Sequence, residues 1–163
     1  MTNERLSISN EIQDLVKQLA ADESGVSAIA ELSQESKDAL YAVAYSHYQS
    51  GKYKEAVVFF QLLTGVDTLN ASYWKGLAAT FQMMKDFERA VEAYSIVAIF
   101  DEKEVDPMPH YHAAQCLHSL GQLERGMQAL KSANAVAKKD KKYQELLPQI
   151  KLQYKSWSKQ LNN

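Results

Sequence analysis

The stretch Trp74-Lys-Gly-Leu77-Ala78-Ala-Thr-Phe81 sets a pattern of large, small and aromatic residues that recurs along this chain of 163 residues. Sixteen residues after its first position comes Ala90, which is followed by Tyr94. Looser copies of the same frame begin at Leu40, 34 residues earlier, and at His110, 36 residues later. The other frame positions are Val43, Ala44, His47, Ala56 and Phe60 in the first copy, and Ala113, Ala114, Leu117, Gly126 and Leu130 in the third.

This frame resembles the tetratricopeptide repeat, a helix–turn–helix unit of about 34 residues. The resemblance predicts an all-α fold of three helix-hairpin repeats, over roughly 34–66, 70–102 and 107–137. A short turn separates the two helices of each repeat. Glycine in two of the turns fits a left-handed helix end, and Lys85 takes that place in the middle copy. The small frame residues mark where neighbouring helices approach closely.

An N-terminal helical segment over 1–33 precedes the repeats. Apolar residues at helical spacing predict a helix over 10–20, with Asn10 as its cap, and a short turn or helix over 26–32. Ser33 is placed to cap the first helix of the first repeat.

The C-terminal segment, 138–163, contains a predicted helix over about 140–161 whose apolar stripe covers the open end of the stack. Pro148 lies inside this helix and is expected to start a new helix or to kink this one. At this length we expect 1–163 to be a single domain. The stripe consists of Tyr143, Leu146, Leu147, Ile150, Tyr154, Trp157 and Leu161.

Composition excludes several classes of function. A net charge of −2 and a pI near 6.1 give no electrostatic footprint for nucleic acid. The one cysteine, Cys116, rules out an internal disulfide and suits a reducing compartment. The longest apolar stretches are too short to insert into a bilayer, and the N-terminus has no secretory signal. We therefore expect a cytoplasmic protein that neither binds nucleic acid nor enters a membrane.

Catalytic chemistry has little support in the sequence. His112 and Cys116 share a helix face at i, i+4, but two ligands without partners are too few for a metal site. A cysteine nucleophile needs a base and an activating environment, and no phosphate-binding or nucleophile-elbow motif is present. We predict no catalytic residue, no metal and no cofactor. An enzyme that uses these two residues stays an alternative, which metal analysis would decide.

A second stripe lies one residue beyond the frame on the first helix of each repeat. In tetratricopeptide proteins this stripe lines the inner, concave groove. The first repeat carries three tyrosines there, which offer apolar bodies and polar tips to an extended, partly apolar peptide. The alternative is that these rings pack against the N-terminal helix or a dimer partner. The candidate groove residues are Tyr41, Tyr45, Tyr48, Ala79, Gln82 and Tyr111.

Two other groups of residues share the stripe. Lys75 and Met83 accompany Ala79 and Gln82 in the second repeat, and Gln115 and His118 follow Tyr111 in the third. Tetratricopeptide co-chaperones that grip a C-terminal carboxylate carry lysine and asparagine where this chain has Tyr41 and Tyr45. Carboxylate capture of that kind is therefore not expected.

Two stretches are similar to the class II chaperones of bacterial type III secretion systems: Leu40-Tyr-Ala-Val-Ala-Tyr-x-x-Tyr-Gln-Ser-Gly-Lys-Tyr-x-x-Ala56 and Tyr111-His-Ala-Ala-Gln-Cys-Leu117. The resemblance spans about residues 24–135. It implies a bacterial cytoplasmic chaperone that binds an extended segment of hydrophobic translocator proteins in its groove. The client would be kept soluble and prevented from assembling prematurely.

The same resemblance implies homodimer contact through the N-terminal segment. It assigns the groove to the three tyrosines of the first repeat, and with weaker correspondence to Ala79, Gln82 and Tyr111. The chain departs from the family at Lys75, where relatives often carry an apolar residue, and at Gly126, where alanine is usual. A general tetratricopeptide scaffold with a different peptide in the groove is the alternative function.

Overall fold

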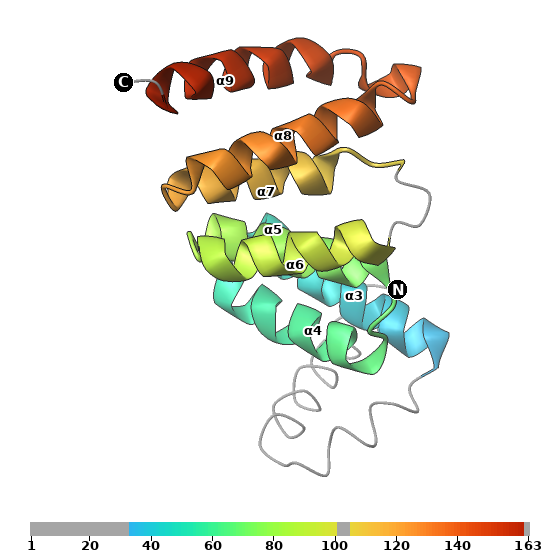
Figure 1. Cartoon of the computed structure of the whole chain (residues 1–163). Helices are drawn as coiled ribbons and strands as arrows, with labels where there is room; N and C mark the ends of the chain where they lie inside the picture. The colour runs from blue at the N-terminus through green and yellow to red at the C-terminus, as the bar shows by residue number, and fades with distance from the viewer. Residues whose placement is uncertain (1–32, 101–104, 162–163) are drawn as a thin grey trace. The chain divides into compact units, whose positions relative to one another are not determined.

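The computed structural model describes residues 33–100 and 105–161, and every regular element within them is helical (Figure 1). The helices expected over 10–20 and 26–32 lie outside the described residues. The chain divides into two compact units, Met1–Tyr73 and Trp74–Asn163. In the described part of the chain, no helix combines the length and the apolar character needed to cross a membrane.

Three helical hairpins follow one another along the chain and confirm the predicted all-α repeat fold. The observed helices keep to the predicted repeat limits within two residues. Their bounds are α3 Gln34–Gln49 with α4 Tyr53–Val66, α5 Ala71–Met83 with α6 Phe87–Phe100, and α7 Met108–Ser119 with α8 Leu123–Ala137.

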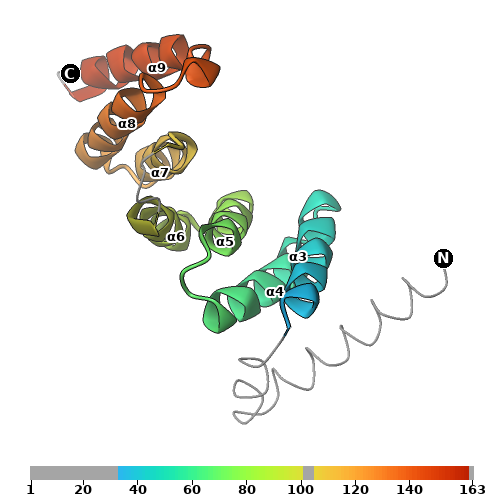
Figure 2. The same cartoon turned by 90° about the vertical axis from the view of Figure 1, so that its right-hand side faces the viewer.

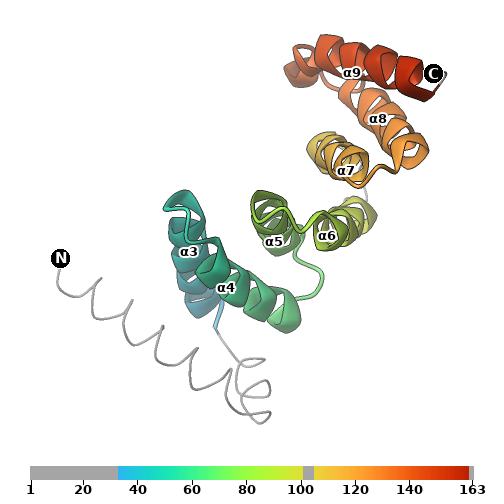
Figure 3. The same ribbon diagram turned by 90° about the vertical axis from the view of Figure 1, so that its left-hand side faces the viewer.

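The first unit is built around the pairing of α3 with α4, which lie side by side in Figure 3. Ser33 caps α3 as predicted, because its Oγ accepts the Ser36 N–H at 3.2 Å. The frame residues form the core between the helices, and each large one contributes about 1.5–3 kcal/mol by its burial. The frame residues at most 3% exposed are Leu40, Ala44, Ala56 and Phe60, and Leu63 of α4 is buried as well.

The second unit adds helices in chain order, so that α6, α7, α8 and α9 (Leu146–Leu161) each lie beside the next (Figure 2). Small frame residues set the closest approach. A Cβ added at Gly126 would lie 3.3 Å from the Ala114 carbonyl oxygen and 3.4 Å from the Trp157 ring. Glycine at this position therefore lets α8 sit directly against α7 while the indole of α9 covers both.

The turns inside the hairpins share one geometry. Gly51 and Gly121 both have φ of 73°, and Lys85 has φ of 61° at the equivalent position. In each turn the following N–H donates back across the helix end, for example from Asp86 to the Phe81 carbonyl at 2.9 Å. This is the glycine-type helix termination that the sequence predicts, with lysine adopting the left-handed conformation in the middle repeat.

The C-terminal segment begins with a 3₁₀ turn, η1 (Lys141–Tyr143), before α9. Pro148 lies in the first turn of α9, where a missing N–H is tolerated, so the proline starts a new helix as expected. Ile150 and Trp157 are buried, and the other stripe residues as far as Tyr154 pack against the same core. Leu161 is the exception at 41% exposed, because it is the last residue of the helix.

Candidate peptide-binding site

Five tyrosines of the first unit form a continuous chain of rings, here called the tyrosine ladder. Tyr41 stacks on Tyr45 with 6.4 Å between ring centroids, and Tyr45 stacks on Tyr48 at 6.3 Å. Tyr73 extends the ladder at one end, 5.7 Å from Tyr41, and Tyr53 extends it at the other, 5.7 Å from Tyr48. The three predicted residues of the first repeat therefore lie together.

The rungs of the tyrosine ladder differ in how far they face solvent. Tyr73 is 3% exposed, and Tyr41 is half-buried against the edge of Phe60. Tyr45 stands out at 49% exposed, and its hydroxyl accepts a hydrogen bond from Gln49 Nε2 at 2.7 Å. The ladder thus has an anchored end and an open middle rung, which offers an apolar face with a polar edge.

The Tyr48 rung of the tyrosine ladder is uncharged near neutral pH. Burial raises the pKa of Tyr48, and the neighbouring hydroxyls of Tyr53 and Tyr45 raise it further. The ring of Tyr48 is therefore a neutral aromatic surface.

Two rungs of the ladder, Tyr53 and Tyr73, were not predicted from the sequence. Tyr53 opens α4 and Tyr73 lies in the first turn of α5, so neither belongs to the helical stripe of α3. A stripe is read within one helix, and these contacts join different helices. Tyrosine at the first position of α4 was the available signal, because it follows directly on the turn that brings α4 back beside α3.

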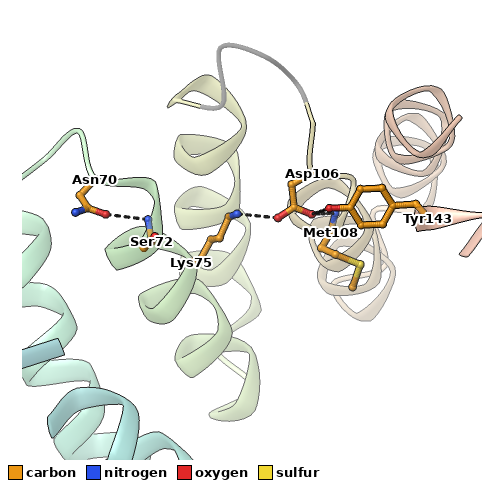
Figure 4. A network of polar contacts seen from close by, with 6 residues as sticks. All are labelled: Asn70, Ser72, Lys75, Asp106, Met108 and Tyr143. Atoms are coloured by element: carbon orange, nitrogen blue, oxygen red, sulfur yellow. Dashed lines mark hydrogen bonds and ion pairs between the residues drawn. The ribbon is translucent and has the colours of Figure 1, made fainter. Parts of the chain in front are cut away.

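In the second unit, the stripe residue Lys75 is already engaged (Figure 4). Its Nζ lies 2.7 Å from Asp106 Oδ2, while Asp106 Oδ1 accepts the Met108 N–H at 3.0 Å and the Tyr143 hydroxyl at 3.5 Å. Burial alone would raise the pKa of Asp106, but the hydrogen bonds from Lys75, Met108 and Tyr143 together lower it. The ion pair thereby holds the Lys75 ammonium group at the start of α7.

Gln82 also makes contacts within the second unit. Its Nε2 donates to Gln115 Oε1 at 3.4 Å, and its Oε1 accepts from the Tyr94 hydroxyl at 2.8 Å. Polar contacts therefore link α5 to the third repeat at two places, from Lys75 to Asp106 just before α7 and from Gln82 to Gln115 within α7. Ala79 lies between them and is partly exposed, and Met83 follows at 49% exposed.

Tyr111 is placed differently from the other candidates. It is 7% exposed and belongs to the core that α9 completes, and its hydroxyl accepts a hydrogen bond from Gln153 Nε2 at 3.1 Å. His118, the last stripe residue of the third repeat, stacks on Trp157 with 4.5 Å between ring centroids. Helix α9 therefore covers the stripe of the third repeat and leaves little of Tyr111 for a ligand.

His112 and Cys116 serve packing. His112 stacks on Tyr94 at 5.6 Å and its Nδ1 lies 3.3 Å from Gln115 Oε1, while burial lowers its pKa. Burial raises the pKa of the Cys116 thiol to about 11, so the thiolate that a nucleophile or metal ligand requires is not formed near neutral pH. Within the described residues, no three histidine, cysteine, aspartate or glutamate side chains gather into a metal site.

Comparison with known families supports the repeat assignment. The tetratricopeptide repeat family matches residues 38–65 and 72–103. Low calcium response locus protein H of Yersinia pestis is 33% identical over 125 residues, which cover 77% of this chain and 73% of the relative.

Solved structures resemble the chain over most of its length. PcrH in complex with the chaperone binding region of PopD is 30% identical with a TM-score of 0.75, covering 80% of this chain and 96% of PcrH. The translocator chaperone SycD of Yersinia enterocolitica, bound to a peptide of the translocator YopD, is 30% identical with a TM-score of 0.74, covering 80% and 98%. SycD in a form described as an alternative dimer gives 28% identity and a TM-score of 0.73, covering 82% and 99%.

Proposed function

Because this chain belongs to the tetratricopeptide-repeat chaperones of bacterial type III secretion translocators, we propose that it binds an extended translocator segment along its tyrosine ladder. PcrH has been solved with the chaperone binding region of PopD and SycD with a peptide of the translocator YopD, and both share this fold. SycD is a translocator chaperone, and the chain likewise acts by binding and is not an enzyme. In this role it keeps a hydrophobic client soluble and prevents its premature assembly.

The observation that carries the proposal is the open rung Tyr45, at 49% exposed within an ordered stack of rings. A ring held between two others loses little further rotamer entropy when a peptide covers it, so more of the contact energy appears as affinity. Translocators carry membrane-seeking segments, and an aromatic ladder offers such a segment apolar contact together with hydroxyl hydrogen bonds.

The groove proposal gives the second-repeat residues a supporting part. Ala79 leaves space between larger neighbours, and the exposed Met83 adds an adaptable apolar surface. Gln82 presents an amide that its contacts with Gln115 and Tyr94 hold in one orientation. We assign the main affinity to the ladder and the weaker contribution to these positions.

The proposal also extends to assembly and location. SycD has been solved as a dimer, and we propose that residues 1–33 mediate a homodimer here as well. Because the client would be held before export, we propose that the chaperone acts in the bacterial cytoplasm. Sedimentation of the full chain and of a chain lacking residues 1–22 tests the dimer. The same oligomeric state for both chains would contradict it.

The decisive experiment is co-expression of the full chain with translocator candidates from the same genome. Tyr45→Ala combined with Tyr48→Ala should reduce partner recovery about tenfold, a loss of roughly 1.4 kcal/mol. Tyr41 is left intact because it packs against Phe60 and Tyr73, so its removal would also cost stability.

The matched control is Leu69→Ala combined with Ile99→Ala, which truncates two apolar side chains, each 72% exposed, that take no part in the ring contacts of the ladder. This pair should leave recovery unchanged, and circular dichroism should report equal helical content for all variants. Equal recovery with the ladder variant would refute the assignment of the ladder. If no translocator binds the wild-type chain while another peptide does, the general scaffold function holds instead.

A further inference from the structure

The modest net charge of the chain conceals a strong asymmetry. Residues 123–163 carry nine lysines and arginines against three aspartates and glutamates, a net charge of +6. Residues 1–122 carry the balance, a net charge of −8. The C-terminal segment that contains α8 and α9 is therefore the basic part of an otherwise acidic protein, and its charge favours acidic partners.

A cavity of about 370 Å³ lies between these two helices. Leu130 of α8 and Ile150 of α9 line it with apolar atoms, and both are at most 2% exposed. The volume falls at the lower end of the range for ligand pockets, which suits one or two side chains of a partner. The cavity lies wholly within the second unit and contains no residue of the tyrosine ladder.

Three lysines line the same cavity. Lys131 comes from α8, and Lys151 and Lys155 come from successive turns of α9. Lys131 Nζ lies 5.6 Å from the centre of the Tyr154 ring, which holds the ammonium group beside the cavity. Across residues 33–100 and 105–161, none of the three lysines is paired with a carboxylate. The cavity is therefore lined both by apolar side chains and by lysines whose charge no described carboxylate neutralises.

The side-chain amide of Asn134 is a further polar group beside the cavity. Asn134 lines the cavity, and its Oδ1 is buried without a hydrogen-bond partner. A buried polar atom without a partner is costly, and a ligand with a polar N–H that the Asn134 amide turns to meet would remove that cost. A peptide backbone supplies both a donor and an acceptor to such an amide, whereas a lipid phosphate or an acyl chain supplies no donor.

We propose that the cavity between α8 and α9 is a second binding site, which takes an acidic peptide segment with an apolar anchor residue. The anchor enters the cavity against Leu130 and Ile150, the flanking carboxylates pair with the lysines, and the backbone hydrogen-bonds to Asn134. Two sites on one chaperone would hold a client at two points, which raises its apparent affinity through effective concentration.

The test uses the full chain and a fluorescein-labelled peptide in which a leucine and a phenylalanine are each flanked by glutamates. Fluorescence anisotropy at physiological ionic strength should give saturable binding. Lys131→Glu combined with Lys155→Glu should weaken binding at least about tenfold. The matched control is Lys138→Glu combined with Lys159→Glu, which makes the same change in net charge at exposed positions outside the cavity and should leave affinity within about twofold.

Two further comparisons define the chemistry. A peptide with serine in place of leucine and phenylalanine should bind much more weakly, because the anchor is gone. Asn134→Leu keeps the size of the side chain but removes the amide, and should weaken binding severalfold. The absence of saturable binding, or equal weakening by both lysine pairs, would overturn the proposal. So would tighter, cavity-dependent binding of anionic vesicles or of single-stranded DNA.

The two proposed binding sites can be tested independently of each other. Tyr45→Ala combined with Tyr48→Ala should leave the acidic peptide bound, since those residues lie on the ladder. Loss of the acidic peptide in that variant would place it on the ladder and would refute the second site without affecting the first.

Discussion

Lys75 and Asp106 join the first helix of the second repeat to the start of the third, with 2.7 Å between Nζ and Oδ2. The same carboxylate accepts the Met108 N–H and so fixes the first turn of α7. Lysine at this stripe position replaces the apolar residue expected from the family. Its charge is directed toward the next helix, where it serves the packing of the repeats.

Asp106→Asn should lower the free energy of unfolding at neutral pH by about 1–2 kcal/mol, because it removes a charged hydrogen bond but keeps an acceptor for Met108. The pKa of Asp106 is lowered in the folded state, so its contribution is present above the unfolded value near 3.9 and is lost as pH falls through the folded value. Urea unfolding should therefore show variant and wild type converging in acid. A constant difference at all pH values would contradict this.

Lys75→Met serves as the matched variant for that prediction. It removes the ion pair but leaves the Asp106 cap on Met108 intact, and the lysine side chain is 43% exposed, so solvent screens the pair. Its loss of stability should be smaller than that of Asp106→Asn. The reverse order would show that the pair matters more than the cap.

His112 should make the fold sensitive to mild acid. Burial lowers its pKa, although the hydrogen bond to Gln115 and the charge of Asp106 oppose the shift. Between the unfolded value near 6.5 and the lower folded value, the unfolded chain binds a proton that the folded chain does not, so stability falls as pH falls through this window. His112→Phe should flatten the dependence of unfolding free energy on pH from about 7.5 to 5.5. An unchanged slope would exclude His112 as the source.

Cys116 should be unreactive in the folded protein. Its thiol is fully buried, and burial raises its pKa to about 11. A disulfide reagent such as dithionitrobenzoate at mildly alkaline pH should release no chromophore from the native chain and one equivalent per chain after urea is added. Rapid labelling of the native protein would mean that α7 opens locally.

Lys85→Gly should stabilise the middle repeat by about 0.5–1 kcal/mol, because lysine at φ of 61° adopts a left-handed conformation that glycine adopts without strain. The equivalent turns provide the control: Gly51→Lys or Gly121→Lys should destabilise by about 1 kcal/mol, since both glycines have φ of 73° and open space around the Cβ position. Thermal unfolding measures all three. A loss of stability in Lys85→Gly would show that the lysine side chain makes a compensating contact.

The sequence predicts best what depends on neighbours along one helix. The spacing of Leu40, Ala44 and Ala56 places the core of the first repeat, and glycine in the turns predicts their left-handed geometry, because both follow from helical periodicity and backbone sterics. The cap at Ser33 and the new helix at Pro148 follow from equally local rules.

Contacts between helices are where prediction from sequence falls short. Tyr53 and Tyr73 join the ladder from α4 and α5, and Lys75 reaches a partner 31 residues away. The burial of Tyr111 depends on where α9 packs, and nothing in the stripe itself indicates that. A pattern within one helix identifies one face of that helix. Which residues of other helices contact that face depends on how the helices pack.

Helix α9 sets the length of the repeat array. By lying over Tyr111 and His118 it occupies the place that the first helix of another repeat would take. Lys151 and Lys155 of α9 line the cavity beside α8, while Lys159 and Leu152, which is 70% exposed, are exposed outside that cavity. Because α9 carries three lysines and no aspartate or glutamate, we expect this helix, which closes the core, also to disfavour the end-to-end stacking of a second copy into a fibre.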